Sequence, residues 1–453
     1  MRNISAFLGI IAKEAIFMLS LWESSTKRPE FPKLRGNTHT DVLIIGGGIA
    51  GILCGYKLKN AGVDCVIAES DKICRGVTSG TTAKITVQHG AVFDKLINKF
   101  GTEKAGLYLK ANEKALSEYR ELCKSIDCDF KETDSYIYSL SDRRKIEKEV
   151  TALNKIGGNA EFCEKTELPF RVAGAVKMSG QAQFNPLKFL YSIAKDLAIY
   201  ENTAVKELKG LTAVCDSGEI RAQKIIVATH FPIINKHGSY FLKMYQKRSY
   251  VSAFLGAKPI NGMYRDESEK GFSFRSAGKV LIIGGESKRT GEKSGGWEQI
   301  RSLAEKYYPT ATEKFNWAAQ DCITLDGVPY IGNYSVNTPD LYVATGFNKW
   351  GMTSSMVAAE ILADMINGKT NEFAKVFSPS RHILRKQLVL NAGSAVCGLV
   401  YPTVKRCPHL GCALKWNKNE RSWDCPCHGS RFSEDGKLLN NPATGDIDLD
   451  VRR

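Results

Sequence analysis

Near its start the chain alternates between short apolar runs and a segment that suits a helix. Residues 42–45 form an uninterrupted apolar run, residues 49–60 suit a helix, and residues 63–68 predict a second, mostly apolar strand. Continuous apolar runs of this length are typical of strands buried on both faces of a parallel sheet. Residues 224–229 predict another strand, and residues 341–366 predict a strand, a glycine-rich turn and a helix. The pattern therefore predicts an α/β fold.

Glycines occupy the turn between the first predicted strand and helix. Gly46, Gly48 and Gly51 give the spacing G-x-G-x-x-G, and Glu69 ends the second predicted strand. In such a unit the first glycine permits a tight turn, the second lets the backbone approach a pyrophosphate, and the third lets helix and strand pack closely. The N–H groups at the helix start attract phosphates, while the acid binds ribose hydroxyls. Because strand, helix and acid accompany the glycines, we interpret the turn as a dinucleotide site.

Later segments favour FAD over NAD as this dinucleotide. Instead of a second strand–helix–strand repeat, residues 75–90 form a loop of small residues that includes Thr81 and Thr82 and suits a flavin's ribityl chain. A later predicted strand ends in a small turn at Thr229. The helix predicted to start near Gly351 can direct its positive N-terminus at a flavin carbonyl, where negative charge develops on reduction.

These segments resemble the FAD-dependent D-amino-acid-oxidase-like superfamily, which includes glycine and sarcosine oxidases. The resemblance covers roughly residues 41–375 and is carried by the glycine turn, the 75–90 loop, VATH, DGVPYIG and GFNKWGMTSS. It implies an FAD-binding Rossmann-like domain over residues 41–380 with an interleaved mixed-sheet substrate domain. The expected substrate segments are 91–150, 168–198 and 236–312. The expected FAD contacts are Gly46, Gly48, Gly51, Glu69, Thr81, Thr82, Val205, Thr229, Gly346, Gly351, Met352 and Thr353.

Two cysteine–histidine pairs near the C-terminal end carry a second chemical signal. Cys407 and His409 form C-x-H, and Cys425 and His428 form C-x-x-H. Each pair offers one thiolate and one imidazole, ligand types that both zinc and iron–sulfur sites use. A zinc site of two cysteines and two histidines usually spaces them as C-x₂₋₄-C and H-x₃₋₅-H, whereas each pair here is mixed. Zinc is therefore the minor alternative, and a purely structural disulfide cluster would leave the histidines unexplained.

The two pairs strongly resemble the ligand loops of a Rieske [2Fe–2S] centre. The resemblance implies that the two cysteines bind one iron and the two histidines bind the other, which raises the reduction potential to about −150 to +300 mV. Cys412 and Cys427 match a pair that forms a loop–loop disulfide in respiratory and photosynthetic Rieske proteins. Ser430 matches a hydroxyl that hydrogen-bonds a cluster sulfur, whereas Phe432 replaces a tyrosine, which argues for a potential below the top of the range. NNPATG at 440–445 resembles the loop that covers the cluster.

The C-terminal piece is short for a Rieske domain. Residues 402–453 hold both ligand loops, and a basic linker, residues 381–401, joins them to the flavin part. We expect a small all-β cluster-binding subdomain that lacks most of the usual base domain. Such a piece has little core of its own, so we expect it to rely on its cluster and disulfide or to pack against the flavin domain. Residues 1–40 predict a lead-in segment, with a short packing helix within residues 1–22.

Composition narrows the class of protein. The 453 residues are 43% apolar and 25% charged, which is ordinary for a globular protein. The net charge is +15, but no basic stretch interleaves with aromatic residues, so we expect no nucleic-acid partner. Association with an anionic membrane surface is a secondary interpretation. Nine of the 13 cysteines lie outside the ligand motif without metal spacing, and no signal-peptide pattern is present, which favours a cytoplasmic location.

The two centres together predict a redox enzyme of the dehydrogenase type. We expect an amine or amino acid, as the family resemblance implies, to reduce the flavin, which passes single electrons to the cluster. An electron-transfer protein or a quinone would then accept them. Two rivals stay open: an oxygen-using amine oxidase with a structural Rieske piece, and a non-enzymatic redox sensor or electron carrier. Electron flow in the reverse direction also stays open.

No motif identifies the catalytic residues, which the sequence leaves unknown. Members of the family often bind a substrate carboxylate with arginine and tyrosine, and four such residues lie in the expected substrate strands. Each is explained equally well as an ordinary strand residue. Two histidines lie in segments expected near the flavin, where packing explains a histidine more often than base catalysis does. These candidates are Arg248, Tyr250, Tyr264, Arg275, His89 and His230.

Overall fold

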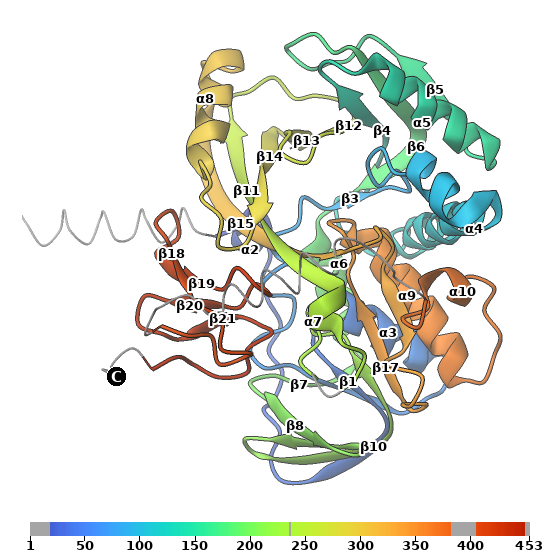
Figure 1. Ribbon diagram of the computed structural model, residues 1–453, viewed down its shortest axis with the longest axis vertical. Coiled ribbons are helices and arrows are strands. Elements are labelled where there is room, and N and C mark those ends of the chain that lie inside the picture. Colours follow the sequence, from blue (N-terminus) through green and yellow to red (C-terminus); the bar gives the residue numbers. More distant parts are fainter. Residues whose placement is uncertain (1–18, 235–236, 382–404, 449–453) are drawn as a thin grey trace, which may run out of the picture.

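Figure 1 shows the computed structural model, which describes residues 19–234, 237–381 and 405–448. These described residues form three sheets: an eight-stranded sheet, a nine-stranded sheet and a four-stranded sheet near the C-terminus. The four-stranded part, drawn in red, lies on one side of the two larger sheets (Figure 1). Most of the predicted 1–22 helix and nearly all of the 381–401 linker fall outside the described residues.

The eight-stranded sheet carries the glycine turn at the end of its central strand. Its order is β16-β17-β10-β1-β2-β7, and a β8–β9 hairpin pairs with β10. Strand β1 pairs in parallel with both neighbours, so that Ile45 lies opposite Val227 and Ala68. Its apolar run is buried on both faces, as the sequence predicts. The bounds are Thr38–Ile45 (β1), Cys65–Ala68 (β2), Ala198–Tyr200 (β7), Val205–Lys209 (β8), Thr212–Cys215 (β9), Gly218–Val227 (β10), Tyr330–Asn333 (β16) and Leu341–Thr345 (β17).

Two helices start at the same edge of this sheet. Helix α3 (Ile49–Asn60) follows β1, and α9 (Gly351–Ile366) follows β17, which runs parallel to β10 and β1. The helices pack against each other, and their contact faces are almost wholly buried. Because parallel strands end at the same edge, both helix N-termini lie where a dinucleotide binds in folds of this class.

The nine-stranded sheet is mixed and is assembled from separate stretches of sequence. Its order is β15-β11-β14-β13-β12-β4-β6-β3, with β5 paired to β6. All neighbours are antiparallel except β12 and β4. The sheet extends through β15, beyond residue 312. The bounds are Lys84–Ile85 (β3), Lys131–Ser139 (β4), Ala160–Cys163 (β5), Gly174–Gln183 (β6), Met244–Leu255 (β11), Met263–Asp266 (β12), Ser273–Ala277 (β13), Val280–Arg289 (β14) and Thr312–Thr324 (β15).

The remaining helices cover the two large sheets. The longest, α4, bends at Gly101, whose φ of +82° is outside the helical range. The short helix α2 belongs to the lead-in segment. Its Trp22 donates a hydrogen bond to the carbonyl of Thr81 at 2.7 Å, which anchors the lead-in segment to the 75–90 loop. The bounds are Leu21–Ser25 (α2), Phe93–Leu122 (α4), Arg143–Lys155 (α5), Pro186–Ala194 (α6), Tyr240–Lys243 (α7), Trp297–Tyr307 (α8) and Ala374–Phe377 (α10).

The C-terminal sheet is an antiparallel meander with its own small core. Its order is β18-β19-β20-β21, with bounds Lys415–Asn417, Ser422–Asp424, Arg431–Ser433 and Leu438–Asn440. Phe432 and Leu414 pack around four buried cysteines. The predicted fold class, an α/β flavin-type domain with an interleaved mixed sheet and a small all-β C-terminal piece, is confirmed. Among the helices of the described stretches, none combines the length and hydrophobicity needed to cross a bilayer.

Candidate functional site

The glycine turn leaves no room for side chains. Gly46 has φ +108°, and a Cβ there would lie 2.6 Å from the carbonyl oxygen of Ala228. A Cβ on Gly51 would lie 1.9 Å from the carbonyl oxygen of Gly46, so helix α3 can approach β1 this closely only with glycine. Gly48 is the N-cap of α3 and has no side chain to cap the first N–H groups. The turn thus exposes backbone N–H groups at the strand edge, as phosphate binding requires.

Glu69 lies beside this turn, at the end of β2. Its Oε2 accepts a hydrogen bond from the backbone N–H of Gly47 at 2.7 Å, and its Oε1 accepts one from Asp71 at 2.9 Å. The carboxylate therefore has a fixed orientation at the rim of the glycine turn. A carboxylate in this place can accept hydrogen bonds from ribose hydroxyls.

A cavity of about 1140 Å³ runs from the glycine turn to the nine-stranded sheet. Its volume exceeds the range of about 300–1,000 Å³ that is usual for small-ligand pockets, which suits a ligand as long as FAD. The glycine turn, the 75–90 loop and the N-terminus of α9 all open into this cavity, so the residues that line it fit FAD. Of the predicted FAD contacts, nine line it: Gly46, Gly48, Glu69, Thr81, Thr82, Val205, Thr229, Gly351 and Met352.

The other three predicted contacts support the wall rather than line it. Gly51 closes the α3–β1 contact. Gly346 has φ +72°, and a Cβ there would meet the Thr324 side chain at 2.3 Å. Thr353 is buried and hydrogen-bonds the Nε2 of His89 at 2.9 Å.

Only one of the four Arg and Tyr candidates lines the cavity, namely Tyr250. Arg248 instead pairs with Glu420 of the C-terminal piece. Tyr264 is buried in the same core as the Tyr250 ring, and its hydroxyl donates to the carbonyl of Asn261 at 3.0 Å. Arg275 is 2% exposed and donates to the carbonyls of the 81–83 loop, so it holds that loop in place.

Both weak histidine candidates line the cavity. His89 bridges Tyr108 and Thr353 and stacks on Trp350 at a centroid distance of 5.2 Å. Burial lowers the pKa of His89 to about 3 and that of His230 to about 4, so both rings are neutral at pH 7. His230 adopts φ +66°, and its Nε2 is buried without a hydrogen-bond partner among the described residues.

The cavity wall also contains residues that the sequence did not single out. Lys349 and Asp321 line it, together with Ser249 and Ser287 of strands β11 and β14. Burial lowers the pKa of Lys349 to about 7 and raises that of Asp321. Lys349 lies inside the GFNKWGMTSS segment that carries the family resemblance, so its position was the one signal that could have identified it.

Two loops with the same hydrogen-bond pattern hold the four predicted iron ligands. In the first, the N–H of Cys407 donates to the carbonyl of Cys412 at 2.9 Å, and that of Gly411 donates back to Cys407 at 2.8 Å. In the second loop, the N–H of Cys425 donates to the carbonyl of Ser430 at 2.8 Å, and the N–H of Gly429 donates to the carbonyl of Cys425 at 3.0 Å. Matching loops bring one cysteine and one histidine each to a common centre.

The two histidines lie side by side, and so do the two cysteines, an arrangement that suits a Rieske cluster. The rings of His409 and His428 lie 5.0 Å apart, nearly perpendicular. His428 Nδ1 is buried and has no hydrogen-bond partner within the described part of the chain, as expected of an atom that binds a metal. Cys407 and Cys425 are each 1% exposed. Ser430 hydrogen-bonds the sulfur of Cys407, the interaction expected of a hydroxyl that tunes the potential.

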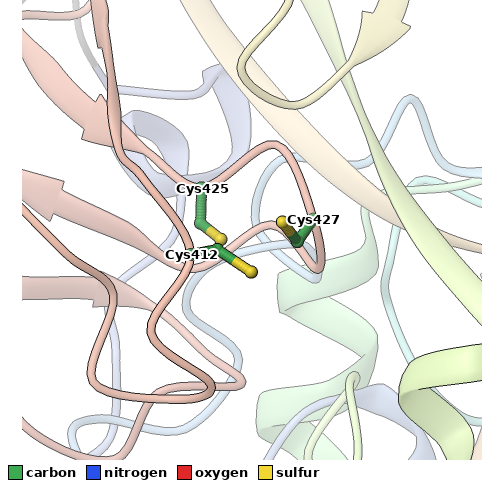
Figure 2. A group of neighbouring side chains, drawn as sticks. All are labelled: Cys412, Cys425 and Cys427. Carbon is green, nitrogen blue, oxygen red and sulfur yellow. The ribbon is translucent and has the colours of Figure 1, made fainter. Parts of the chain in front are cut away.

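Figure 2 shows Cys412, Cys425 and Cys427, whose sulfur atoms lie within 4.8 Å of one another. Cys412 and Cys427 face each other across the two loops, as the resemblance implies. The predicted bridge between them is not shown: the structure has both as free cysteines. The two side chains nevertheless pack in the core of the subdomain and help to bring the loops together.

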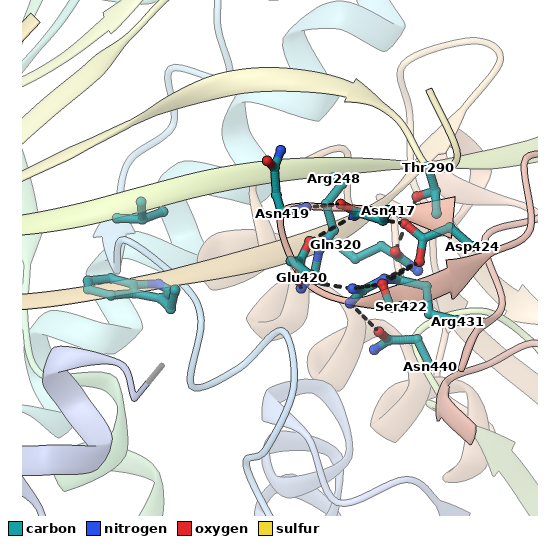
Figure 3. A network of polar contacts seen from close by, with 12 residues as sticks. Arg248, Thr290, Gln320, Asn417, Asn419, Glu420, Ser422, Asp424, Arg431 and Asn440 are labelled. Atoms are coloured by element: carbon teal, nitrogen blue, oxygen red, sulfur yellow. Dashed lines mark hydrogen bonds and ion pairs between the residues drawn. The ribbon is translucent and has the colours of Figure 1, made fainter. Parts of the chain in front are cut away.

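A buried polar network fixes the C-terminal piece on the nine-stranded sheet (Figure 3). Arg248 of β11 and Arg431 of β20 both pair with Glu420, whose side chain is 5% exposed. Burial would raise the pKa of Glu420, but the two guanidinium groups hold it at about 2. Arg431 also pairs with Asp424 at 2.9 Å. The buried charges are thus compensated across the contact.

The same contact places the cluster loops beside the flavin cavity. Asn441, in the loop predicted to cover the cluster, donates to the carbonyl of Phe231 at 2.9 Å. The Phe231 ring lies 6.5 Å from the His409 ring and 6.4 Å from the His428 ring. The end of the C-terminal piece also forms part of the cavity wall. The residues that do so are Leu438, Leu439, Asn440, Asn441, Ala443, Thr444, Gly445 and Asp446.

Comparison with known proteins agrees with this architecture. The pattern of the family described as FAD dependent oxidoreductase matches residues 41–365, and that of the Rieske [2Fe-2S] domain matches residues 365–449. The chain therefore belongs to the FAD-dependent oxidoreductase family and carries a Rieske domain at its C-terminal end. It is an oxidoreductase whose two domains bind FAD and a [2Fe–2S] cluster.

Individual relatives cover the whole chain or one part of it. A putative Rieske 2Fe-2S iron-sulfur protein, YhfW from Bacillus subtilis, is 34% identical over 95% of this chain and 97% of its own length. The cytochrome b6-f complex iron-sulfur subunit 1 of Synechocystis is 50% identical over 40 residues, which are 9% of this chain and 22% of that protein. Glycine oxidase from Geobacillus kaustophilus shares the fold, with a TM-score of 0.65 and 20% identity over 76% of this chain and all of its own.

Proposed function

We propose that this oxidoreductase oxidises an amine or amino acid at FAD and passes the electrons one at a time to its Rieske centre. The segment Thr229–Phe231 carries the proposal. Thr229 lines the flavin cavity, whereas the Phe231 ring contacts both histidine ligands, two residues further along. FAD supplies an acceptor of two electrons that can release them singly, and the cluster accepts one at a time.

The substrate class is supported by the fold and by the cavity. Glycine oxidase, with the same fold, acts by its name on an amino acid. The cavity wall beyond the FAD contacts includes four charged residues, Lys247, Arg265, Asp321 and Lys349. Such a wall suits a small zwitterion better than an apolar substrate.

The orientation of the cluster loops supports an electron route between the flavin and the cluster. Both histidine ligands face Phe231 and the flavin domain. We infer that electrons enter the cluster through this histidine side and leave to an electron-transfer protein or a quinone. A cytoplasmic location is supported by the cysteines outside the Rieske loops, since all those in the described ranges are thiols.

An anaerobic reduction experiment tests the proposal. The purified protein is assayed for iron, zinc and FAD, and then mixed with amines and amino acids without oxygen. A reducing substrate should bleach the flavin bands and then produce the EPR signal of a reduced Rieske cluster. Peroxide formed in equal amount to substrate oxidised, with the cluster staying oxidised, would instead show an oxidase with a structural Rieske piece. Failure of every amine and amino acid to bleach the flavin would favour a redox sensor or carrier.

A further inference from the structure

Lys349 extends from the start of α9, on the flavin side of the cavity, to the nine-stranded sheet that forms the other wall. It lies between β17 and α9, two residues before Gly351, where the helix N-terminus meets the cavity. Its Nζ donates a hydrogen bond to the hydroxyl of Ser249 on β11 at 2.9 Å and another to Ser287 on β14. A flexible lysine is thus held in one position, with its nitrogen at the wall of the nine-stranded sheet.

The backbone that presents Lys349 is in an unusual conformation. Asn348 and Lys349 both have positive φ values, +52° and +76°, which non-glycine residues seldom adopt. Contacts of the Asn348 side chain compensate: its Oδ1 accepts from the N–H of Thr324 at 2.8 Å, and its Nδ2 donates to the carbonyl of Gly346 at 2.8 Å. Strain that the surroundings maintain in this way is concentrated at functional sites.

Amine oxidation needs a proton acceptor. An amine or amino acid is mostly an ammonium ion at pH 7, whose nitrogen has no lone pair to form a C=N bond as hydride leaves the carbon. We propose that Lys349 accepts this proton from the substrate's ammonium group in the cavity. The inference rests on the proposed function, because it assigns a residue to that same reaction.

The proton balance is simple. The ammonium N–H bond breaks, a new N–H bond forms on the neutral Lys349 amine, and no electrons change hands in this step. The substrate is left as a neutral amine beside an ammonium ion at Lys349. Hydride then leaves the substrate carbon with its electron pair for the flavin, and the nitrogen lone pair forms the C=N bond.

The surroundings of Lys349 allow it to be neutral near pH 7. Its pKa is lowered to about 7, chiefly by burial. Arg265 on β12 and Lys247 on β11 also lower it, whereas Asp321 on β15 and Glu269 in the β12–β13 loop raise it. A base whose pKa lies near the working pH is well suited to proton transfer. The reaction rate should therefore rise with pH as Lys349 loses its proton.

The first test needs no substrate. The absorption spectrum of the oxidised flavin is recorded against pH in wild type, Lys349→Met, Lys349→Arg and the exposed control Lys258→Met. Wild type and Lys258→Met should show a spectral step near pH 7, because a charge beside the cavity changes, while both Lys349 variants should lack it. An arginine stays charged over this range and cannot release the proton. A step that persists in Lys349→Met would overturn the inference.

The second test measures the rate of flavin bleaching by the best amine or amino acid found. In Lys349→Met and Lys349→Arg the rate at pH 7 should fall roughly 100-fold or more, the usual contribution of a positioned base. It should recover towards the pKa of the free amine, where solution supplies the neutral form. Rates within threefold of wild type would overturn the inference. If the spectral step depends on Lys349 but no amine bleaches wild type, the proposed amine oxidation fails, and the proton transfer fails with it.

Discussion

The side-chain amide of Gln246 donates a hydrogen bond to the carbonyl oxygen of His428 at 2.7 Å. Gln246 lies on β11 of the nine-stranded sheet, and His428 is a predicted iron ligand. The same amide donates to the carbonyl of Asn441 at 3.0 Å, and Gln320 of β15 donates to Gly429 at 2.7 Å. The second ligand loop is therefore bound to the wall of the flavin cavity through its backbone, which does not depend on the side chains at the cluster.

Replacing Gln246 with leucine should destabilise this contact. The carbonyls of His428 and Asn441 would lose a buried donor, which costs about 1–3 kcal/mol. Urea unfolding followed by the visible absorbance of the cluster should show the loss, while the flavin signal changes less. Gln223→Leu is the matched control, because Gln223 forms its hydrogen bond to Asp41 at the exposed surface. Equal stabilities for the two variants would contradict the role assigned to Gln246.

Arg248 should contribute more than an ordinary surface arginine. Its side chain and that of Glu420 are 12% and 5% exposed, so Arg248→Met leaves a buried carboxylate with one partner fewer. Breaking a buried ion pair from one side costs about 3–5 kcal/mol. Arg421 forms a pair with Glu434 that is mostly in solvent, so Arg421→Met should cost no more than about 1 kcal/mol. Urea unfolding at pH 7 compares the two, and similar costs would show that the Arg248 pair adds nothing special.

The Glu420 carboxylate also makes stability depend on pH. Its pKa is about 2 in the folded protein, below the value of about 4.3 expected in the unfolded chain. Its contribution is therefore fully present above about pH 4.3 and is lost as the pH falls towards 2. The stability difference between wild type and Glu420→Gln should be constant from pH 7 to pH 5 and shrink below that range. A difference that stays constant to pH 3 would contradict the assigned pKa.

Much of the flavin fold could be predicted because its signals are local. The apolar run before Gly46 and the glycine spacing after it are set within a few residues, and both occur in the structure as predicted. The nine-stranded sheet was harder to delimit, because its strands come from separate stretches of sequence. Nothing local shows that β15 pairs with β11 across more than fifty residues. Non-local pairing is thus the part of the fold that the sequence pattern leaves open.

The site shows the same contrast. The cysteine–histidine spacing identified four donors that the structure brings together, because each pair lies in one short loop. Arg248 was a candidate for substrate binding, but it faces Glu420, which is remote in sequence. Lys349 was not selected, because only the folded chain shows that two serines from different strands hold it at the cavity. Spacing reveals ligands within a loop, whereas cavity walls are assembled from many elements.

The glycine at position 51 should be essential for FAD binding. An alanine there would place its Cβ 1.9 Å from the carbonyl oxygen of Gly46, so helix α3 would have to move away from β1. We expect Gly51→Ala to lose most of its FAD and about 1–3 kcal/mol of stability. Gly106→Ala is the control, since its Cβ would meet nothing closer than 3.9 Å and alanine favours a helix by about 1 kcal/mol. The measurement is the ratio of FAD absorbance to protein in each purified variant. A Gly51→Ala protein that carries a full complement of FAD would contradict the role assigned to the tight α3–β1 contact.

Loss of one iron ligand should separate the two centres. Cys407→Ser removes one donor of the proposed cluster, and we expect iron content to fall to near zero while FAD is retained. The small C-terminal core is built around four cysteines, so without its cluster this subdomain should become more sensitive to proteases. Cys163→Ser is the control, because Cys163 lies in β5 of the nine-stranded sheet, where its thiol donates a hydrogen bond to the carbonyl of Lys165 at 3.1 Å. Iron and FAD analysis with limited proteolysis compares the variants. If Cys407→Ser keeps its iron, Cys407 is not a ligand; if FAD is lost as well, the flavin domain depends on the Rieske piece for its fold.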